Sequence, residues 1–129
     1  MSSTHTADAA RISDAARHHD DGEHAVIATD ISGTIVYWNA AAEALYGWTE
    51  RDVLDHNIVD ITPTRASVDA AMHIMEHLRK GESWTGDFIL KHRDGRPIYA
   101  HVTDVPVLHE GSVIGVVGVS RRARRPSVP

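Results

Sequence analysis

The segment from His73 to His77, which reads HIMEH, is the stretch whose residue types and spacing could most directly perform chemistry. Two histidines four residues apart share one face of a helix and can bind zinc, and a glutamate between them can act as a general base, as in an inverted zinc-protease motif. Such a site also requires a third ligand and an open cleft. The chain contains ten histidines, so a pair at this spacing arises easily by chance, and helical phasing turns it away from the core. We therefore expect an exposed helix face and no catalytic or metal-binding residue, with a metal-dependent hydrolase as an alternative.

Length, charge and cysteine content restrict the other classes of function. The 129 residues suffice for one domain with a single core. The absence of cysteine excludes disulfides, thiolate metal sites and a cysteine nucleophile, and it fits a cytoplasmic protein. Residues 1–120 carry nine Lys and Arg against eighteen Asp and Glu, which makes a poor surface for nucleic acid. No apolar run approaches the roughly 18 residues of a membrane span, so we expect no membrane partner.

The hydrophobic pattern predicts two strands, several short helices, one longer helix and then three strands. β-prone runs at 25–30 and 34–38 flank an Ile-Ser-Gly turn and predict a hairpin. Apolar residues at helical spacing over 65–80 predict the longer helix. The last three strands are expected at 84–92, 97–108 and 112–120. This segregation predicts an α+β fold in which a five-stranded antiparallel sheet carries short helices and one longer helix on one face.

The sequence VYWNAAAEALYG at 36–47 passes from a strand directly into a helix of small residues. Asn39 is placed to cap that helix by accepting hydrogen bonds from backbone N–H groups, and Gly47 is placed to end it in a left-handed conformation. Thr49, with Asp52 three residues later, predicts a second short helix. The segment offers no nucleophile and no phosphate-binding loop, so we expect it to determine shape.

Taken in order, these features resemble the PAS (Per-Arnt-Sim) sensor domain family over residues 24–120. The resemblance lies in the segments AVIATDISGTIVYWN, AAAEALYGWTERDVL, LRKGESWTG, RDGR and VIGVVGVS. It implies helices that cross a curved sheet and enclose a pocket. It also implies a structural turn that shapes the pocket wall, formed here by Asn39, Ala42, Leu45 and Gly47.

The resemblance divides the chain into three parts. Residues 1–23 form an N-terminal extension, which either folds as a short amphipathic helix around 7–18 or stays disordered, and residues 24–120 form the PAS domain. Residues 121–129, RRARRPSVP, are typical of a basic, proline-containing linker to a downstream effector. One departure is Asp55, where many relatives have glycine, and we expect it to alter the next helix.

Two cofactors found in the family are disfavoured by this sequence. Light-oxygen-voltage members use a cysteine that bonds flavin, together with two asparagines and a glutamine that bind its ring. This chain has no cysteine, and the resemblance places Leu90, Ala100 and Val117 at the three amide positions. Haem-binding members have a histidine on the long helix where this chain has Ala70. We therefore expect neither flavin nor haem.

If Leu90, Ala100 and Val117 face inward, alternation along the strands, together with the helices, gives an apolar pocket wall. Its predicted residues are Leu45, Ile58, Ile61, Met72, Met75, Phe88, Leu90, Ile98, Ala100, Val102, Gly115 and Val117, with Val119 at the strand end. Such a wall suits a long apolar ligand, such as a fatty-acyl chain, or else its side chains fill the core. Candidate polar contacts at one end of the ligand are Asn57, Thr85, Asp87 and Asp104.

The last strand is apolar on both faces, and strands of this kind are normally covered on both sides. The outer cover is either the N-terminal helix or a second copy of the domain. We favour a homodimer whose face contains Ile114 and Val116.

The resemblance implies a sensory or regulatory domain of a bacterial multidomain signalling or stress-response regulator. It would bind an apolar small molecule or a protein partner and relay the signal to a downstream effector. Relatives precede histidine kinases, or phosphatase and kinase modules that control stress sigma factors. The alternative is a structural homodimerisation module with a filled core.

Overall fold

The computed structural model describes residues 2–62 and 68–123, with the side chains of 7–62 and 73–123. The elements in chain order are α1 (Ser2–His19), β1 (Ala25–Asp30), β2 (Ile35–Trp38), α2 (Ala40–Tyr46), α3 (Glu50–Val53), α4 (Ile58–Ile61), α5 (Val68–Arg79), β3 (Trp84–Lys91), β4 (Pro97–His109) and β5 (Ser112–Arg122). The strands form one five-stranded sheet in the order β2-β1-β5-β4-β3, and every neighbouring pair is antiparallel. The predicted α+β fold is therefore confirmed.

The predicted elements differ from the observed ones mainly at their ends. β5 continues to Arg122, so the first two residues of the expected linker at 121–129 belong to the sheet. Arg121 and Arg122 pair with His101 and Ala100 of β4. Residues 124–129 of that segment, and 65–67 of the expected long helix, lie outside the described residues.

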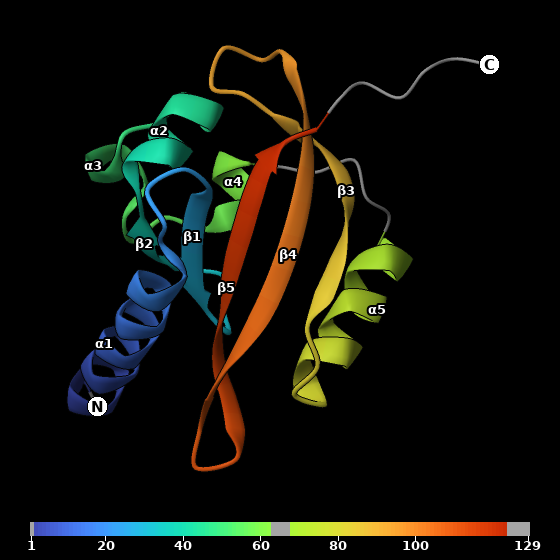
Figure 1. The fold of residues 1–129 in the computed structure, drawn as a ribbon. Coiled ribbons are helices and arrows are strands. Elements are labelled where there is room, and N and C mark those ends of the chain that lie inside the picture. Colours follow the sequence, from blue (N-terminus) through green and yellow to red (C-terminus); the bar gives the residue numbers. More distant parts are fainter. Residues whose placement is uncertain (1, 63–67, 124–129) are drawn as a thin grey trace.

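The inner face of the sheet carries the main core. Trp38 of β2, Leu45 and Tyr46 of α2, Val53 of α3 and Ile98 of β4 are buried together there, because apolar residues at strand and helix periods face one another. In Figure 1 the short helices α2, α3 and α4 gather beside β1 and β2, and α5 lies along β3 at the other side of the sheet. The short helices therefore lie near one edge of the sheet, and α5 lies near the other edge.

The outer face of the sheet is covered by α1, which lies next to β1 and β2 in Figure 1. Ile12 of α1 is fully buried with outward side chains of β1, β4 and β5. Gly115 of β5 permits this approach, because a Cβ atom there would collide with the Ile12 side chain and with the carbonyl oxygen of Thr29. The N-terminal extension is thus a helix over Ser2–His19, and it supplies one of the two covers that the sequence allowed.

Asp55, where many family members have glycine, adopts the left-handed conformation with φ of 70°. Aspartate tolerates this conformation better than most side chains. Its N–H donates to the carbonyl of Ile35 at 3.1 Å, and α4 then begins after the capping residue Asn57. Asp55 thus takes up the conformation that suits glycine, and its effect on the next helix stays a prediction.

None of the helices in the described part of the chain is both long enough and apolar enough to cross a membrane. The cytoplasmic location stays a prediction.

Candidate functional site: a cavity on the inner face of the sheet

Asn39 and Gly47 fix the two ends of α2, which forms part of the wall around the site. The Oδ1 atom of Asn39 accepts hydrogen bonds from the N–H groups of Ala42 and Val26, both at 2.9 Å. Gly47 has φ of 82°, its N–H donates to the carbonyl of Glu43, and a side chain there would collide with the His92 ring. This geometry agrees with the structural turn expected from the sequence.

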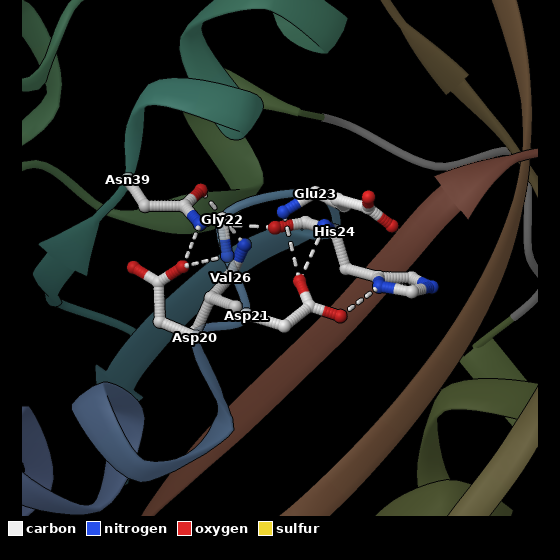
Figure 2. Close-up of polar contacts among 7 residues, drawn as sticks. All are labelled: Asp20, Asp21, Gly22, Glu23, His24, Val26 and Asn39. Carbon is white, nitrogen blue, oxygen red and sulfur yellow. Dashed lines mark hydrogen bonds and ion pairs between the residues drawn. The ribbon is translucent and has the colours of Figure 1, made fainter.

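The segment between α1 and β1 is held by carboxylates that accept backbone N–H groups (Figure 2). Asp21 accepts from the N–H groups of Glu23 and His24, and its other oxygen lies 2.6 Å from the His24 ring nitrogen Nδ1. The backbone N–H of His24 is the main reason why the pKa of Asp21 is lowered to about 2. These ionisable groups therefore have partners that hold the segment in place.

A cavity of about 340 Å³ lies between the inner face of the sheet and helices α4 and α5. This volume is within the range of small-molecule sites. Its wall is mostly apolar and comprises Ile27, Thr29, Asp30, Ile31, Gly33, Tyr46, Ile58, Val59, Thr62, Ile74, Met75, Leu78, Phe88, Leu90, Val102, Asp104, Val116, Gly118 and Ser120. Ile31 and Val59 are among the most exposed large apolar residues of the described chain.

Several predicted wall residues are brought to this cavity and others are not. Those that line it are Ile58, Met75, Phe88, Leu90 and Val102. Leu45, Ile61 and Ile98 are buried in the core cluster of the inner face, and Ala100 is fully buried. The side chain of Met72 lies outside the described residues. That any of these residues contacts a ligand stays a prediction.

Gly115 and Val117 do not line the cavity, so this part of the predicted wall is wrong. Val102 of β4, which does line it, lies opposite Ser120 of β5. Opposed residues of an antiparallel pair share a face, so the inward residues of β5 are Val116, Gly118 and Ser120. Because β5 is apolar on both faces, its sequence alone does not reveal which face is inside, and a shift of one residue exchanges the two faces.

The two residues of the predicted dimer face, Ile114 and Val116, lie in different places, on the outer face and in the cavity wall. Val116 lines the cavity, so its assignment to an outer dimer face is wrong. Ile114, Val117 and Val119 belong to the cluster that α1 covers. A homodimer stays a prediction, and in this structure the cover of the outer face is α1.

Two polar groups of the cavity wall satisfy each other. The Tyr46 hydroxyl and the Ser120 hydroxyl are 2.8 Å apart and buried. Burial is the main cause that raises the pKa of Tyr46 to about 12. This hydrogen bond joins α2 to the C-terminal part of β5. Neither residue was identified from the sequence as part of the site. Ser120 lies opposite Val102 of β4, and this register is what brings it to the cavity wall.

Among the four predicted polar contacts, only Asp104 lines the cavity. Asn57 caps α4 by accepting from the N–H of Val59, and its amide donates to the Ser32 carbonyl. Thr85 and Asp87 are exposed and face partners on β4. Asp104 comes from β4, opposite Trp84 of β3 and Gly118 of β5.

The HIMEH segment lies on α5 with His73 and Glu76 exposed. The His77 ring nitrogen Nδ1 is 3.1 Å from the His73 carbonyl oxygen, which is a contact within the helix. Within residues 2–62 and 68–123, no group of three His, Cys, Asp or Glu side chains is arranged to hold a metal ion.

Comparison with known families agrees with this architecture. The model of the family described as PAS fold matches residues 23–123. The chain belongs to the PAS family. Its members are sensory domains, and a five-stranded antiparallel sheet with several short helices is their architecture. No curated protein matches the chain.

Solved PAS structures share the fold at low sequence identity. A PAS domain from Colwellia psychrerythraea is 23% identical, with a TM-score of 0.67 over 85% of this chain and 94% of that one. An RNA-binding light-oxygen-voltage receptor is 22% identical, with a TM-score of 0.70 over 82% of this chain and 31% of that one. The blue-light activated histidine kinase EL346 of Erythrobacter litoralis is 18% identical, with a TM-score of 0.67 over 81% of this chain and 34% of that one.

Proposed function

We propose that this PAS domain is a sensor whose inner cavity binds a small molecule with an apolar body, and that occupancy is relayed to an effector. The observation that supports the proposal is the cavity of about 340 Å³ with a mostly apolar wall. Burial of an apolar ligand there would contribute roughly 25 cal/mol per Å² of surface removed from water.

The route of the signal that we propose runs through β5. Three residues of β5 line the cavity, and the strand then continues to Arg122. The hydrogen bond between Tyr46 and Ser120 lies in the same wall. A ligand that packs against Tyr46 changes the relative stability of two arrangements of α2 and β5, and differential affinity for two states is what couples binding to output.

The effector that we propose is a kinase module of a signalling protein. EL346, which has the same fold in part of its chain, is a blue-light activated histidine kinase, and this supports an effector of that class. Modules that control stress sigma factors, expected from the sequence, stay the alternative effector.

Filling the cavity tests the binding proposal. We expect n-octanol to bind the wild-type domain in isothermal titration calorimetry and to raise its melting temperature. Val116→Phe places a larger side chain in the cavity and is expected to weaken n-octanol binding by at least about tenfold. Leu108→Phe is the matched control, because Leu108 is exposed and lies outside the cavity wall. Equal binding by the wild type and Val116→Phe would contradict the proposal.

A further inference from the structure

Asp104 is a carboxylate in the wall of an otherwise apolar cavity. Its strand, β4, directs Val102 and Asp104 to the same inner face. Within residues 7–62 and 73–123, no hydrogen bond or ion pair to the Asp104 carboxylate is found. Burying an ionised carboxylate in apolar surroundings costs free energy unless a hydrogen-bond donor or a cation compensates its charge. A carboxylate in this position is therefore a candidate contact for a ligand that supplies such a group.

The other ionisable residues of the described wall do not supply that partner. Tyr46 is bonded to Ser120, and Asp30 accepts hydrogen bonds from the N–H groups of Ser32 and Thr34. The wall contains no lysine, arginine or histidine among the described residues. Asp104 is therefore the carboxylate of the described wall for which no partner is found among the described residues.

The space around the carboxylate is created by Gly118 on the neighbouring strand. A Cβ atom at position 118 would lie 3.0 Å from the Oδ1 atom of Asp104, which is tighter than most real contacts. Gly118 is in an extended strand and has no unusual φ, so its lack of a side chain has a packing reason. The cavity thus accommodates the carboxylate at its wall.

Burial raises the pKa of Asp104 to about 6. At pH 7.5 the carboxylate is still mostly ionised, since this pH lies above that value. A charged group without a partner among the described residues is then available to a ligand.

We propose that the cavity selects ligands that combine an apolar body with a hydrogen-bond donor, best a protonated amine, which binds the Asp104 carboxylate, and that it discriminates against carboxylates. This inference rests on the proposed function, since it names the chemical class of the cavity's ligand. It narrows the apolar ligands expected from the sequence, because the carboxylate of a free fatty acid is repelled by Asp104 at this wall. A charge-assisted hydrogen bond supplies the preference for an amine.

Three probes that share an eight-carbon chain and differ in the head group test which head group the cavity prefers. They are n-octylamine, n-octanol and n-octanoate. In titration calorimetry at pH 7.5 we expect n-octylamine to bind most tightly and n-octanoate most weakly, with at least about tenfold between them. Asp104→Asn removes the charge at constant size, and we expect it to bring the amine and the acid to within about threefold. Asp87→Asn, which removes an exposed carboxylate on β3 outside the cavity wall, is expected to keep the wild-type order.

A second measurement on the wild type avoids any folding defect of the variant. The affinity for n-octylamine is expected to fall at least about fivefold between pH 7.5 and pH 5, as Asp104 takes up a proton, while n-octanol binding changes little. Binding of all three probes with equal affinity, unchanged in Asp104→Asn, would overturn the head-group inference and leave the proposed function standing. Failure of all three probes to bind would overturn both. An amine preference that also persists in Asp104→Asn would show attraction by the acidic surface and would overturn the inference.

Discussion

The Asn39 amide nitrogen Nδ2 donates to the Oδ1 atom of Asp20 at 3.0 Å, and so connects the turn before α2 to the segment that follows α1. The same carboxylate accepts the Tyr37 hydroxyl at 2.8 Å, and this bond is the main reason why the pKa of Asp20 is lowered. Asn39 also donates to the carbonyl of His24 (Figure 2). One amide therefore joins α1, β1 and α2.

We expect Asn39→Ala to lower the free energy of unfolding by roughly 2 to 4 kcal/mol. The change removes the cap of α2 and leaves the N–H of Val26, a fully buried residue, without its side-chain acceptor. Urea denaturation measures the loss. Thr49→Ala is the control, because Thr49 is exposed and caps α3 with one hydrogen bond, and its loss is expected to cost about 1 kcal/mol. Equal losses in the two variants would contradict a role for Asn39 beyond capping.

The bond between Tyr46 and Ser120 predicts non-additive effects on stability. Tyr46→Phe and Ser120→Ala each remove one of the two buried hydroxyls and leave the other without its hydrogen-bond partner. Each substitution is therefore expected to lower the free energy of unfolding by roughly 1 to 3 kcal/mol. The double variant removes both polar groups and is expected to cost clearly less than the sum of the two single losses. Unfolding measurements on the four proteins provide the test, and additive losses would show that the two hydroxyls do not interact.

The packing of Ile12 predicts that α1 stabilises the domain through the outer face. Ile12→Ala leaves a cavity between α1 and the sheet and is expected to cost roughly 2 to 4 kcal/mol. Ala10→Ser on the exposed side of the same helix is expected to change stability by less than about 0.5 kcal/mol. Thermal and urea unfolding would distinguish the two variants.

The outer face is expected to become a surface for association between two copies when α1 is displaced. Ile12→Asp is expected to detach α1 and to expose Val26, Ala28 and Val117, so that two copies cover each other. Light scattering should then report a dimer, with circular dichroism to verify that the sheet is retained. A folded variant that stays monomeric would argue against association through this face.

The raised pKa of Asp104 is expected to make the free energy of unfolding fall as the pH rises. The folded-state pKa is about 6, above the ordinary value of 3.8, so the folded state binds the proton more tightly than the unfolded state. The stabilisation is complete below about pH 3.8 and is lost as the pH rises through about 6, with an amplitude of roughly 2 to 3 kcal/mol. Unfolding curves of the wild type and Asp104→Asn between pH 4 and 7.5 measure it. The lowered pKa of Asp21 acts in the opposite direction but at lower pH, between about 2 and 3.8. A wild-type minus Asp104→Asn difference that does not vary with pH would contradict the assignment.

Features that depend on residues close together in the chain were predictable. The strand at 25–30, the cap at Asn39 and the left-handed end at Gly47 follow from backbone preferences that neighbouring residues decide. On β3 and β4 the alternation of polar and apolar residues also placed Phe88, Leu90 and Val102 on the inner face.

Features that depend on residues far apart in the chain could not be predicted from the sequence. β5 is apolar on both faces, so only its register with β1 and β4 decides that Val116 faces the cavity and that Val117 faces Ile12. Asp104 was one of four candidate polar contacts that the sequence did not rank, and it lines the cavity because β4 places it between Trp84 and Gly118. The sequence by itself determined the PAS fold, since local turns, caps and periodicity agree with one topology. Only the tertiary structure decided the chemistry of the cavity wall, because side-chain direction in a two-sided strand is settled by what packs against each face.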